Sequence, residues 1–566
     1  MAQLIRDQLA ALIKTAIHEA QQAGALPAFD LPRIEISRPK VAAHGDYSTS
    51  VAMVLAKQAA LPPLQIAEYI AGHAPAHEAV GKIEVVKPGY INMTLSEAWL
   101  AQQVQAILDA GSTWANLELG RGRQVQVEHG SANPTGPLHF GTARNVVVGD
   151  AVANILAAAG YAVQREYYVN DAGSQVRRFG ESVYARYAQA LGRDEPFPED
   201  GYRGEYIADL AQHIAGERGD YFLTLEKGEA ARALGQIGLD AMVEGQRQTL
   251  ARMNIHYDRW FHERSLYDSG LFDTMLELLR ARGLVYQQDD ATWFKVSAFI
   301  DEKDAVIVRS PKVIPDPRER PTYFGSDIAY MHDKFVDRGF DRVIYVWGAD
   351  HHGDLPRMQA ICRAFGIAPE RLTVLLYQLV TLTRGGEEVR QSKRRGEFVA
   401  LDEVIDEIGS DAIRFMLLTR SNDSKITLDL ELAKEQSDKN PVYYVQYAHA
   451  RIASILRRAA EVGLDTQPHA RPAMRLLRHP SELALIRKML EFPLVIEQAA
   501  RDLAPHHLTH YAQDLASAFS AFYRDCKVVD PAAPDLTAAR LRLCRAAKMT
   551  LAQVLGLMGM SAPESM

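Results

Sequence analysis

The chain has 566 residues, of which 47% are hydrophobic and 24% charged, and its formal net charge is −8. This length supports several buried cores, so we expect two to four domains, and the acidic balance excludes a protein that coats DNA without regard to sequence. No apolar run reaches the roughly 18 residues of a membrane-spanning helix, so we expect neither membrane insertion nor secretion. The three cysteines show no Cys-x-x-Cys spacing, which favours a reducing cytoplasm over a disulfide framework or a zinc knuckle.

The first part of the chain mixes helical and strand-like patterns. Residues 2–23 have the pattern of an amphipathic helix that ends at Gly24, and two more helical patterns follow, around "VAMVLAKQA" and after Pro62. The segments "RIEISRPK" and "KIEVVKPGYINMTL" have the composition of strands. We therefore predict an N-terminal α+β domain over residues 1–114.

A strand, a turn, a helix and a second strand follow. The segment "RQVQVEHG" alternates as a strand does, and a turn rich in Pro and Gly comes after it. Residues 143–159 predict a helix that Gly160 ends, and "AVQREYYVND" predicts the next strand. This order indicates a βαβ unit with parallel strands.

Residues 173–300 are more charged and interrupt this pattern, so we expect an insertion around residues 185–290. The pattern resumes at "RVIYVWGADHHG", whose residues 343–347 are apolar without alternation, as in a parallel strand covered on both faces. The strand-like segment "LTVLLYQLV" follows. We therefore predict a Rossmann-type α/β domain with a parallel sheet over residues 115–440.

The remainder of the chain has only helical patterns. Residues 441–566 contain 15 Lys and Arg against 11 Asp and Glu, a surplus of four positive charges in an otherwise acidic protein. We predict an all-α helical bundle over residues 441–566, and its positive bias is compatible with a nucleic-acid backbone as partner. Solvated helix faces produce such biases as well.

The turn at residues 129–142, "HGSANPTGPLHFGT", connects the first strand of the parallel sheet to its helix. At this place the helix N-terminus presents free N–H groups and the positive end of its dipole to anions. The turn contains neither the P-loop pattern nor Gly-x-Gly-x-x-Gly. Gly141 would let a phosphate or base approach the backbone, and His139 and Thr142 offer donors to phosphate oxygens.

The segment "SANPTGPLHFGTARNVVVGD" resembles the His-x-Gly-His signature of class I aminoacyl-tRNA synthetases, and its surroundings resemble the arginyl members of that class. "VRQSKRRGEFVALDEVIDEIGSDAIRFMLL" is similar to their Lys-Met-Ser-Lys loop region, with residues 390–393 at the four motif positions. Further matches are "YYVNDAGSQ", "PTYFGSDIAY", "WGADHH", "NPVYYVQYAHARI" and the terminal "MSAPESM". The resemblance spans nearly the whole chain and implies that the α/β domain is catalytic.

The resemblance implies a site for ATP at the turn. Attack of the amino-acid carboxylate on the α-phosphate needs positioning and charge stabilisation more than covalent help. His139 would donate to the phosphates, Lys393 would meet the charge on the leaving pyrophosphate, and Thr142 completes the predicted catalytic set. The other predicted ATP contacts are Gly141, Gly348, Asp350 and Ser392. We expect magnesium on the phosphates and no dedicated metal site in the protein.

The resemblance also implies an arginine pocket. A guanidinium group rewards planar acceptors such as carboxylates, which the family would supply here through Asp327, with Tyr323 beside it. The remaining predicted contacts are Glu128, Ser131, Asn133 and His351. Two alternatives stay open: Asp327 could be a helix N-cap, and the histidines of "WGADHHG" could bind a metal ion.

For tRNA, the resemblance implies that the N-terminal domain binds the elbow of the molecule and that the C-terminal bundle binds the anticodon. Tyr90 would stack on a base and Asn92 would contact a base edge. Tyr447 and Arg451 are the candidates in the bundle. The alternative for Tyr90 is a place in the core of its small domain.

The sequence departs from the family pattern at two signature positions. Thr142 replaces the second histidine, and Gln391 replaces the methionine of the loop. Some members lack the loop lysine and carry a lysine at the position of Gly136, whereas this chain retains Lys393. We predict an ATP-dependent arginine–tRNA ligase that acts through an arginyl-adenylate, as a cytoplasmic monomer with tRNA(Arg), L-arginine and ATP as partners and no membrane association. A related nucleotidyltransferase and a protein that binds tRNA without catalysis remain as alternatives.

Overall fold

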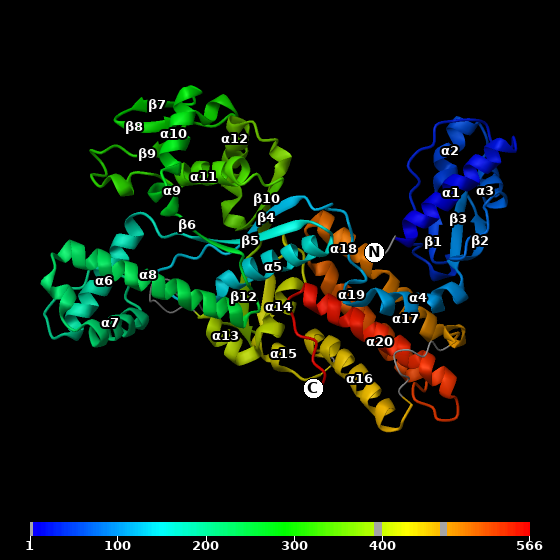
Figure 1. The fold of residues 1–566 in the computed structure, drawn as a ribbon. Helices are drawn as coiled ribbons and strands as arrows, with labels where there is room; N and C mark the ends of the chain where they lie inside the picture. Colours follow the sequence, from blue (N-terminus) through cyan, green and yellow to red (C-terminus); the bar gives the residue numbers. More distant parts are fainter. Residues whose placement is uncertain (1–3, 390–398, 438, 465–472) are drawn as a thin grey trace.

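The computed structural model describes residues 4–389, 399–437, 439–464 and 473–566. A five-stranded parallel sheet forms its centre, an α+β unit lies at the N-terminal end, and a helical bundle lies at the C-terminal end (Figure 1). This arrangement confirms the predicted fold class. In Figure 1 the N-terminal unit, in blue, stands apart from the sheet and reaches the rest of the molecule through α4, beside the orange and red helices of the bundle.

The N-terminal unit packs three helices on a small antiparallel sheet with the strand order β1-β3-β2. Its elements are α1 (Ile5–Gln22), β1 (Tyr47–Thr49), α2 (Val51–Ala59), α3 (Pro63–Gly72), β2 (Val80–Val86), β3 (Tyr90–Leu95) and α4 (Glu97–Ala110). Helix α1 buries one apolar stripe, as its pattern predicts. An ion pair of 2.7 Å between Asp46 and Arg487 helps to attach this unit to the bundle.

The central sheet has the strand order β11-β10-β4-β5-β6, and all its pairings are parallel. Its strands are β4 (Gln124–Glu128), β5 (Ala162–Val169), β6 (Arg259–His262), β10 (Arg342–Gly348) and β11 (Leu372–Tyr377). Helix α5 (Ala143–Ala158) connects β4 to β5, and α12 (Leu355–Phe365) connects β10 to β11. The strand order reverses between β4 and β10, so the carboxyl ends of these two strands border the crevice in which such sheets bind ligands.

The stretch predicted as an insertion contains one strand of the central sheet. Helices α6 (Ser174–Ala190), α7 (Glu205–Arg218) and α8 (Lys227–Arg252) pack together, but the chain then returns as β6, which pairs with β5. The sequence did not predict this strand, because four residues at a sheet edge show no clear periodicity. A second group of elements lies between β6 and β10 in the chain. It consists of α9 (Ser265–Asp268), α10 (Leu271–Ala281), β7 (Val285–Gln288), β8 (Ala291–Phe294), β9 (Ala305–Val308) and α11 (Tyr323–His332).

A small sheet and the bundle complete the chain. The sheet has the order β13-β12-β14, with β12 (Val380–Arg384), β13 (Glu387–Glu388) and β14 (Ile426–Asp429), and beside it lie α13 (Leu401–Ile408), α14 (Ser410–Leu418) and α15 (Leu430–Lys434). The bundle consists of α16 (Pro441–Glu461), α17 (Pro480–Leu490), α18 (Phe492–Asp502), α19 (His506–Asp525) and α20 (Pro534–Leu557). Within the described part of the chain no helix is long and apolar enough to cross a membrane, and the three cysteines are buried thiols.

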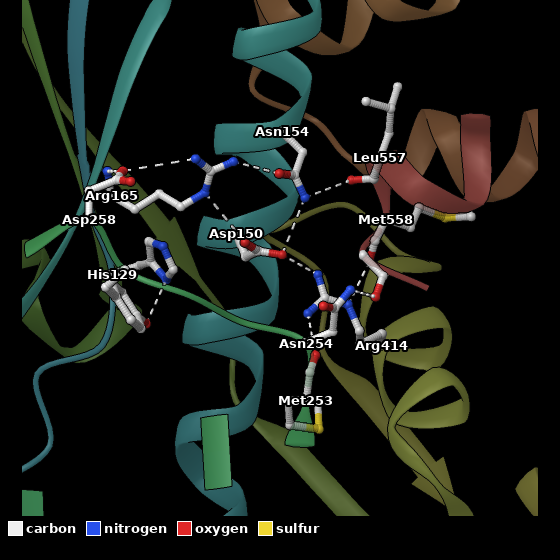
Figure 2. A network of polar contacts seen from close by, with 12 residues as sticks. His129, Asp150, Asn154, Arg165, Met253, Asn254, Asp258, Arg414, Leu557 and Met558 are labelled. Carbon is white, nitrogen blue, oxygen red and sulfur yellow. Dashed lines mark hydrogen bonds and ion pairs between the residues drawn. The ribbon is translucent and has the colours of Figure 1, made fainter. Parts of the chain in front are cut away.

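The end of the bundle is joined to α5 by buried polar contacts, which we call the hub (Figure 2). The guanidinium of Arg414, on α14, forms an ion pair with Asp150 of α5 and donates to the carbonyls of Met558 (2.6 Å) and Met253 (2.8 Å). Gly559 adopts φ +71°, and a Cβ there would overlap the guanidinium of Arg414. The last turn of the chain's final helix is therefore held against the helix that follows the predicted ATP turn.

Candidate active site

The turn that carries the first signature lies beside residues 399–401, which follow the second signature in sequence. The amide of Phe140 donates to the carbonyl of Val399 (2.9 Å), and the amide of Leu401 donates to the carbonyl of Leu138 (2.8 Å). His139 and Ala400 form the antiparallel bridge between these bonds. The loop that precedes residue 399 thus ends against the predicted ATP turn. Its predicted residues Ser392 and Lys393, and with them Gln391, lie outside the described residues.

The turn itself is held in shape by its own side chains. A Cβ at position 141 would lie 2.7 Å from Nδ1 of His139, so the glycine leaves room for the imidazole to lie across the backbone. The hydroxyl of Thr142 donates to the carbonyl of His139 (2.5 Å). His139 is exposed, while the proton of the Thr142 hydroxyl is engaged inside the turn.

Two residues directly after the turn hold it against the rest of the site, and sequence reasoning assigned no role to either. Arg144 is fully buried and donates to the carbonyls of Gln378, Ser421 and Ser424, and burial lowers its pKa to about 10. Asn145 donates to the carbonyl of Val346 (2.6 Å) and accepts from the amide of residue 130 (2.5 Å). Asn145 thus fixes the start of α5 to the carboxyl ends of β4 and β10, and Arg144 fixes it to the segments after β11 and before β14.

The opposite side of the crevice is acidic. Glu128 ends β4 and is buried, and Asp327 lies one turn into α11, half-buried. Burial raises the pKa of Asp327 to about 8, and the nearby carboxylates of Glu263 and Glu128 add to this rise. Thr322 is the N-cap of α11, through a bond from the amide of residue 325 (3.1 Å), so the alternative role of Asp327 as an N-cap is wrong.

Glu263 is an acidic residue of this crevice that sequence reasoning missed. It directly follows β6, only 3% of its surface is exposed, and one carboxylate oxygen accepts from the Ser326 hydroxyl (2.7 Å). The other oxygen has no hydrogen-bond partner among the described residues, and burial raises the pKa of the group to about 7. A charged residue at the carboxyl end of a strand would have been the signal, but β6 itself was not recognised.

The other predicted contacts lie in the loops around this crevice. Ser131 and Asn133 are exposed in the loop after β4, and Tyr323, at the first position of α11, is 62% exposed. His351 and Asp350 are exposed in the turn after β10, where Nδ1 of His351 lies 3.2 Å from a carboxylate oxygen of Asp354.

Gly348 ends β10, and a Cβ there would lie 2.4 Å from Oδ1 of Asp350. The glycine therefore allows the close turn that brings Asp350 over the end of the strand. In the described ranges no group of three or more His, Cys, Asp or Glu side chains is placed to hold a metal ion.

The predicted tRNA contacts differ in accessibility. Tyr90 is 41% exposed at the start of β3, which speaks against the alternative of a core residue. Asn92 is only 4% exposed and its side-chain oxygen accepts from the Ser48 hydroxyl (2.7 Å), so its amide faces the domain interior. Contact of Asn92 with a base stays a prediction.

Tyr447 and Arg451 lie together on α16. Arg451 donates to the Tyr447 hydroxyl (2.7 Å), and its guanidinium lies 4.6 Å from the centre of the Tyr523 ring. They line a pocket of about 820 Å³ whose other basic residues are Arg457, Arg458, Arg524 and Lys527. Aromatic faces and guanidinium groups in one basic pocket suit an unstacked nucleic-acid base.

Three family profiles match the sequence and together cover nearly all of it. They are described as the arginyl tRNA synthetase N terminal domain (residues 7–95), the catalytic domain of class I tRNA synthetases (R) (residues 103–453) and the DALR anticodon binding domain (residues 445–566). A curated arginine–tRNA ligase from Dehalococcoides mccartyi strain CBDB1 is 47% identical over 562 residues, 99% of each chain. One from Carboxydothermus hydrogenoformans is 44% identical over the full length of both chains. The solved arginyl-tRNA synthetase of Thermus thermophilus has a TM-score of 0.72 and 25% identity over all of both chains.

Proposed function

This chain belongs to the arginyl-tRNA synthetase family, and from that premise we propose how its own side chains divide the reaction. The protein ligates arginine to tRNA, and the class I catalytic domain implies ATP as the source of activation. The main support for this assignment of residues is the pairing of residues 138–140 with residues 399–401. Residue 399 lies six positions after Lys393 in sequence, and its segment pairs with the turn that contains the exposed His139.

We propose that ATP binds at the start of α5. His139 would donate to the phosphates from the exposed side of the turn, and the adjacent helix N-terminus would add its free N–H groups. Lys393 would meet the charge of the departing pyrophosphate. Because the Thr142 hydroxyl already donates inside the turn, we propose that this residue acts mainly by holding the turn closed. Gly141, Gly348, Asp350 and Ser392 complete the proposed ATP contacts.

We propose that the acidic side of the crevice receives the cationic groups of arginine. Asp327 would face the guanidinium, with Tyr323 at the rim, and Glu263 supplies a buried carboxylate oxygen without a partner in the described chain. Several carboxylates at close range disfavour one another's ionisation, and a bound cation removes that cost. Glu128, Ser131, Asn133 and His351 complete the proposed pocket.

For tRNA, we propose that Tyr90 contacts the elbow and that Tyr447 and Arg451 contact the anticodon loop. The aromatic and basic lining around Arg451 supports the second assignment. We keep 1–114, 115–440 and 441–566 as the proposed domain boundaries. We further propose that the protein works as a cytoplasmic monomer, where its buried thiols stay reduced, and that magnesium accompanies the ATP phosphates, because it dehydrates reluctantly and prefers them to a closed protein cage.

Charging of arginine tRNA by the purified full-length chain tests this proposal. We expect arginyl-tRNA to form from labelled arginine in the presence of ATP, and lysine not to be charged, because an ammonium cannot fill a site built for a forked guanidinium. Lys393→Ala should lower kcat by roughly 10²–10³ and leave the KM for arginine near its original value. Binding of tRNA without any charging would overturn the proposal.

A further inference from the structure

A row of polar side chains crosses the central sheet below the proposed arginine pocket. In the strand register Tyr345 of β10 stands next to Glu128 of β4, which stands next to Glu166 of β5, and Arg259 of β6 ends the row. Residues paired in this way point to the same face of a sheet. Two carboxylates therefore lie on neighbouring central strands, where burial without a partner would be costly.

One turn of chain supplies a cation to each of these carboxylates. The turn Asp333–Asp337 directly follows α11 and is wound as a short π-helix, and it brings Lys334 and then Arg338 over the row. Arg338 forms two bonds to the carboxylate of Glu166 (2.5 and 3.0 Å). Lys334 forms an ion pair with Glu128.

The ammonium of Lys334 is held unusually firmly. The side chain is 0% exposed, and its nitrogen lies 3.9 Å from the centre of the Tyr330 ring and 4.0 Å from that of Tyr345. Two aromatic faces and one carboxylate thus enclose it, which fixes the position of the charge. The same arrangement fixes the Glu128 carboxylate at the end of β4, where the crevice begins.

The charges around the pocket suit arginine only when this ammonium is counted. Glu128, Glu263 and Asp327 are three carboxylates, and Lys334 forms an ion pair with one of them, Glu128. When all four groups are ionised, their charges sum to −2. Arginine brings two cationic groups, the guanidinium and the α-ammonium. Without Lys334 one carboxylate would be left over, and repulsion would favour its protonation.

We infer that Lys334 is a positioning residue for arginine binding, which acts by holding the Glu128 carboxylate ionised and aimed at the crevice. This inference rests on the proposed place of Glu128 in the arginine pocket. Lys334 touches neither ATP nor the reacting carboxylate in this scheme, so its removal should change the affinity for arginine more than the rate of activation.

The pH dependence follows from the groups that surround Glu128. Burial raises the pKa of Glu128, and Lys334 opposes this rise; Lys334 also opposes the rise at Asp327. Loss of the ammonium therefore raises the pKa of these carboxyls further, and arginine binding should weaken most at low pH. The charged and titratable groups that act on Glu128 or Lys334 from the packed elements are Glu166, Tyr330, Arg338 and Tyr345. Those that act on Asp327 include Glu263 and Asp354.

The experiment measures the KM for arginine and kcat of the full-length enzyme in tRNA-dependent pyrophosphate exchange between pH 6.5 and 9. Lys334→Met should raise the KM about tenfold or more at the lowest pH, since a shift of one pKa unit is a tenfold change in ionisation. The ratio of variant to wild-type KM should fall as the pH rises, with kcat changed less than about threefold. Lys334→Arg should restore the wild-type profile, because it keeps the charge.

Arg338→Met is the matched control. It removes a neighbouring, partly buried cation that follows the same turn, and this cation pairs with Glu166 and not with Glu128. If Lys334→Met and Arg338→Met change KM and kcat by equal factors at every pH, the role of Lys334 is packing and the inference is overturned.

If Lys334→Met does not fold, the double variant Glu128→Gln/Lys334→Met removes both charges of the pair and is compared with Glu128→Gln. A KM of the double variant close to that of Glu128→Gln supports the inference, because Lys334 acts on Asp327 more weakly than on Glu128. A further rise as large as the one that Glu128→Gln itself produces contradicts it. An unchanged KM in Glu128→Gln alone would instead remove Glu128 from the proposed pocket.

Discussion

Two clusters of charge lie beside β4 and differ in balance. In the hub, Arg165 and Arg414 face the buried Asp150, Arg165 also faces Asp258, which is half exposed, and further donors of Arg414 reach backbone carbonyls (Figure 2). In the proposed arginine pocket, Glu128 is paired with the ammonium of Lys334, whereas Asp327 has no ion pair and an oxygen of Glu263 has no hydrogen-bond partner in the described chain. A balanced buried cluster holds the fold together, whereas an unbalanced one costs stability until a cation binds.

The largest expected effect is a loss of stability when the hub is disrupted. Arg414→Met leaves Asp150 buried beside Arg165 alone, and breaking such a pair costs about 3–5 kcal/mol of unfolding free energy. Denaturant unfolding should show this loss, while the KM for arginine stays unchanged. Arg252→Met, which removes exposed ion pairs, should cost about 1 kcal/mol or less. A raised KM for arginine in Arg414→Met at normal stability would contradict the comparison.

In the proposed arginine pocket, a substitution should change the KM for arginine more than the stability of the protein. Asp327→Ala removes a carboxylate that forms no ion pair with the described residues, so the protein should fold as well as the wild type or better. The KM for arginine should rise about a hundredfold, since each charge-assisted hydrogen bond to the guanidinium contributes about 1.5–3 kcal/mol. Steady-state pyrophosphate exchange measures the KM, with Asp337→Ala as a control at an acidic residue that pairs with His332. An unchanged KM would dismiss Asp327 from the pocket.

The pH dependence of arginine binding sharpens the comparison further. Burial raises the pKa of Asp327 to about 8, so below this pH the carboxyl is mostly protonated and, in the proposed pocket, arginine must displace the proton. The KM for arginine should therefore fall as the pH rises from 7 to 9. Glu263→Gln removes the neighbouring charge that contributes most to the raised pKa of Asp327, so the fall in KM should move to lower pH. If the KM for arginine falls over the same pH range in Glu263→Gln as in the wild type, the carboxyls of Glu263 and Asp327 do not interact.

The smallest effect should come from the turn. Thr142→Ala removes the hydrogen bond that closes the turn and should cost about 1 kcal/mol of stability, with kcat reduced only a few-fold. Thr142→Ser keeps the hydroxyl and should behave as the wild type in both assays. A loss of kcat by two orders of magnitude in Thr142→Ala, at normal stability, would instead indicate direct contact of this hydroxyl with ATP.

Local patterns in the sequence were sufficient for most of the long elements and for the family, but not for the edge strand β6. Apolar periodicity placed α1, α5, β4, β10 and the helices of the bundle, because burial of one face or of both faces leaves a regular trace in the sequence. The two signatures and the "YFGSD" segment pointed to ATP and arginine because their chemistry is carried by residues that lie close together in the chain.

Only the tertiary structure decided which distant residues share the site and which are already engaged. Glu263 lies at the proposed pocket because a short edge strand, β6, ends at the same side of the sheet as β4. Arg144 directly follows the first signature and Lys334 follows the "YFGSD" segment, yet one is bound to backbone carbonyls and the other to Glu128. A sequence pattern records whether a position is buried, but the partner of a buried charge comes from another strand or turn, and folding brings the two together.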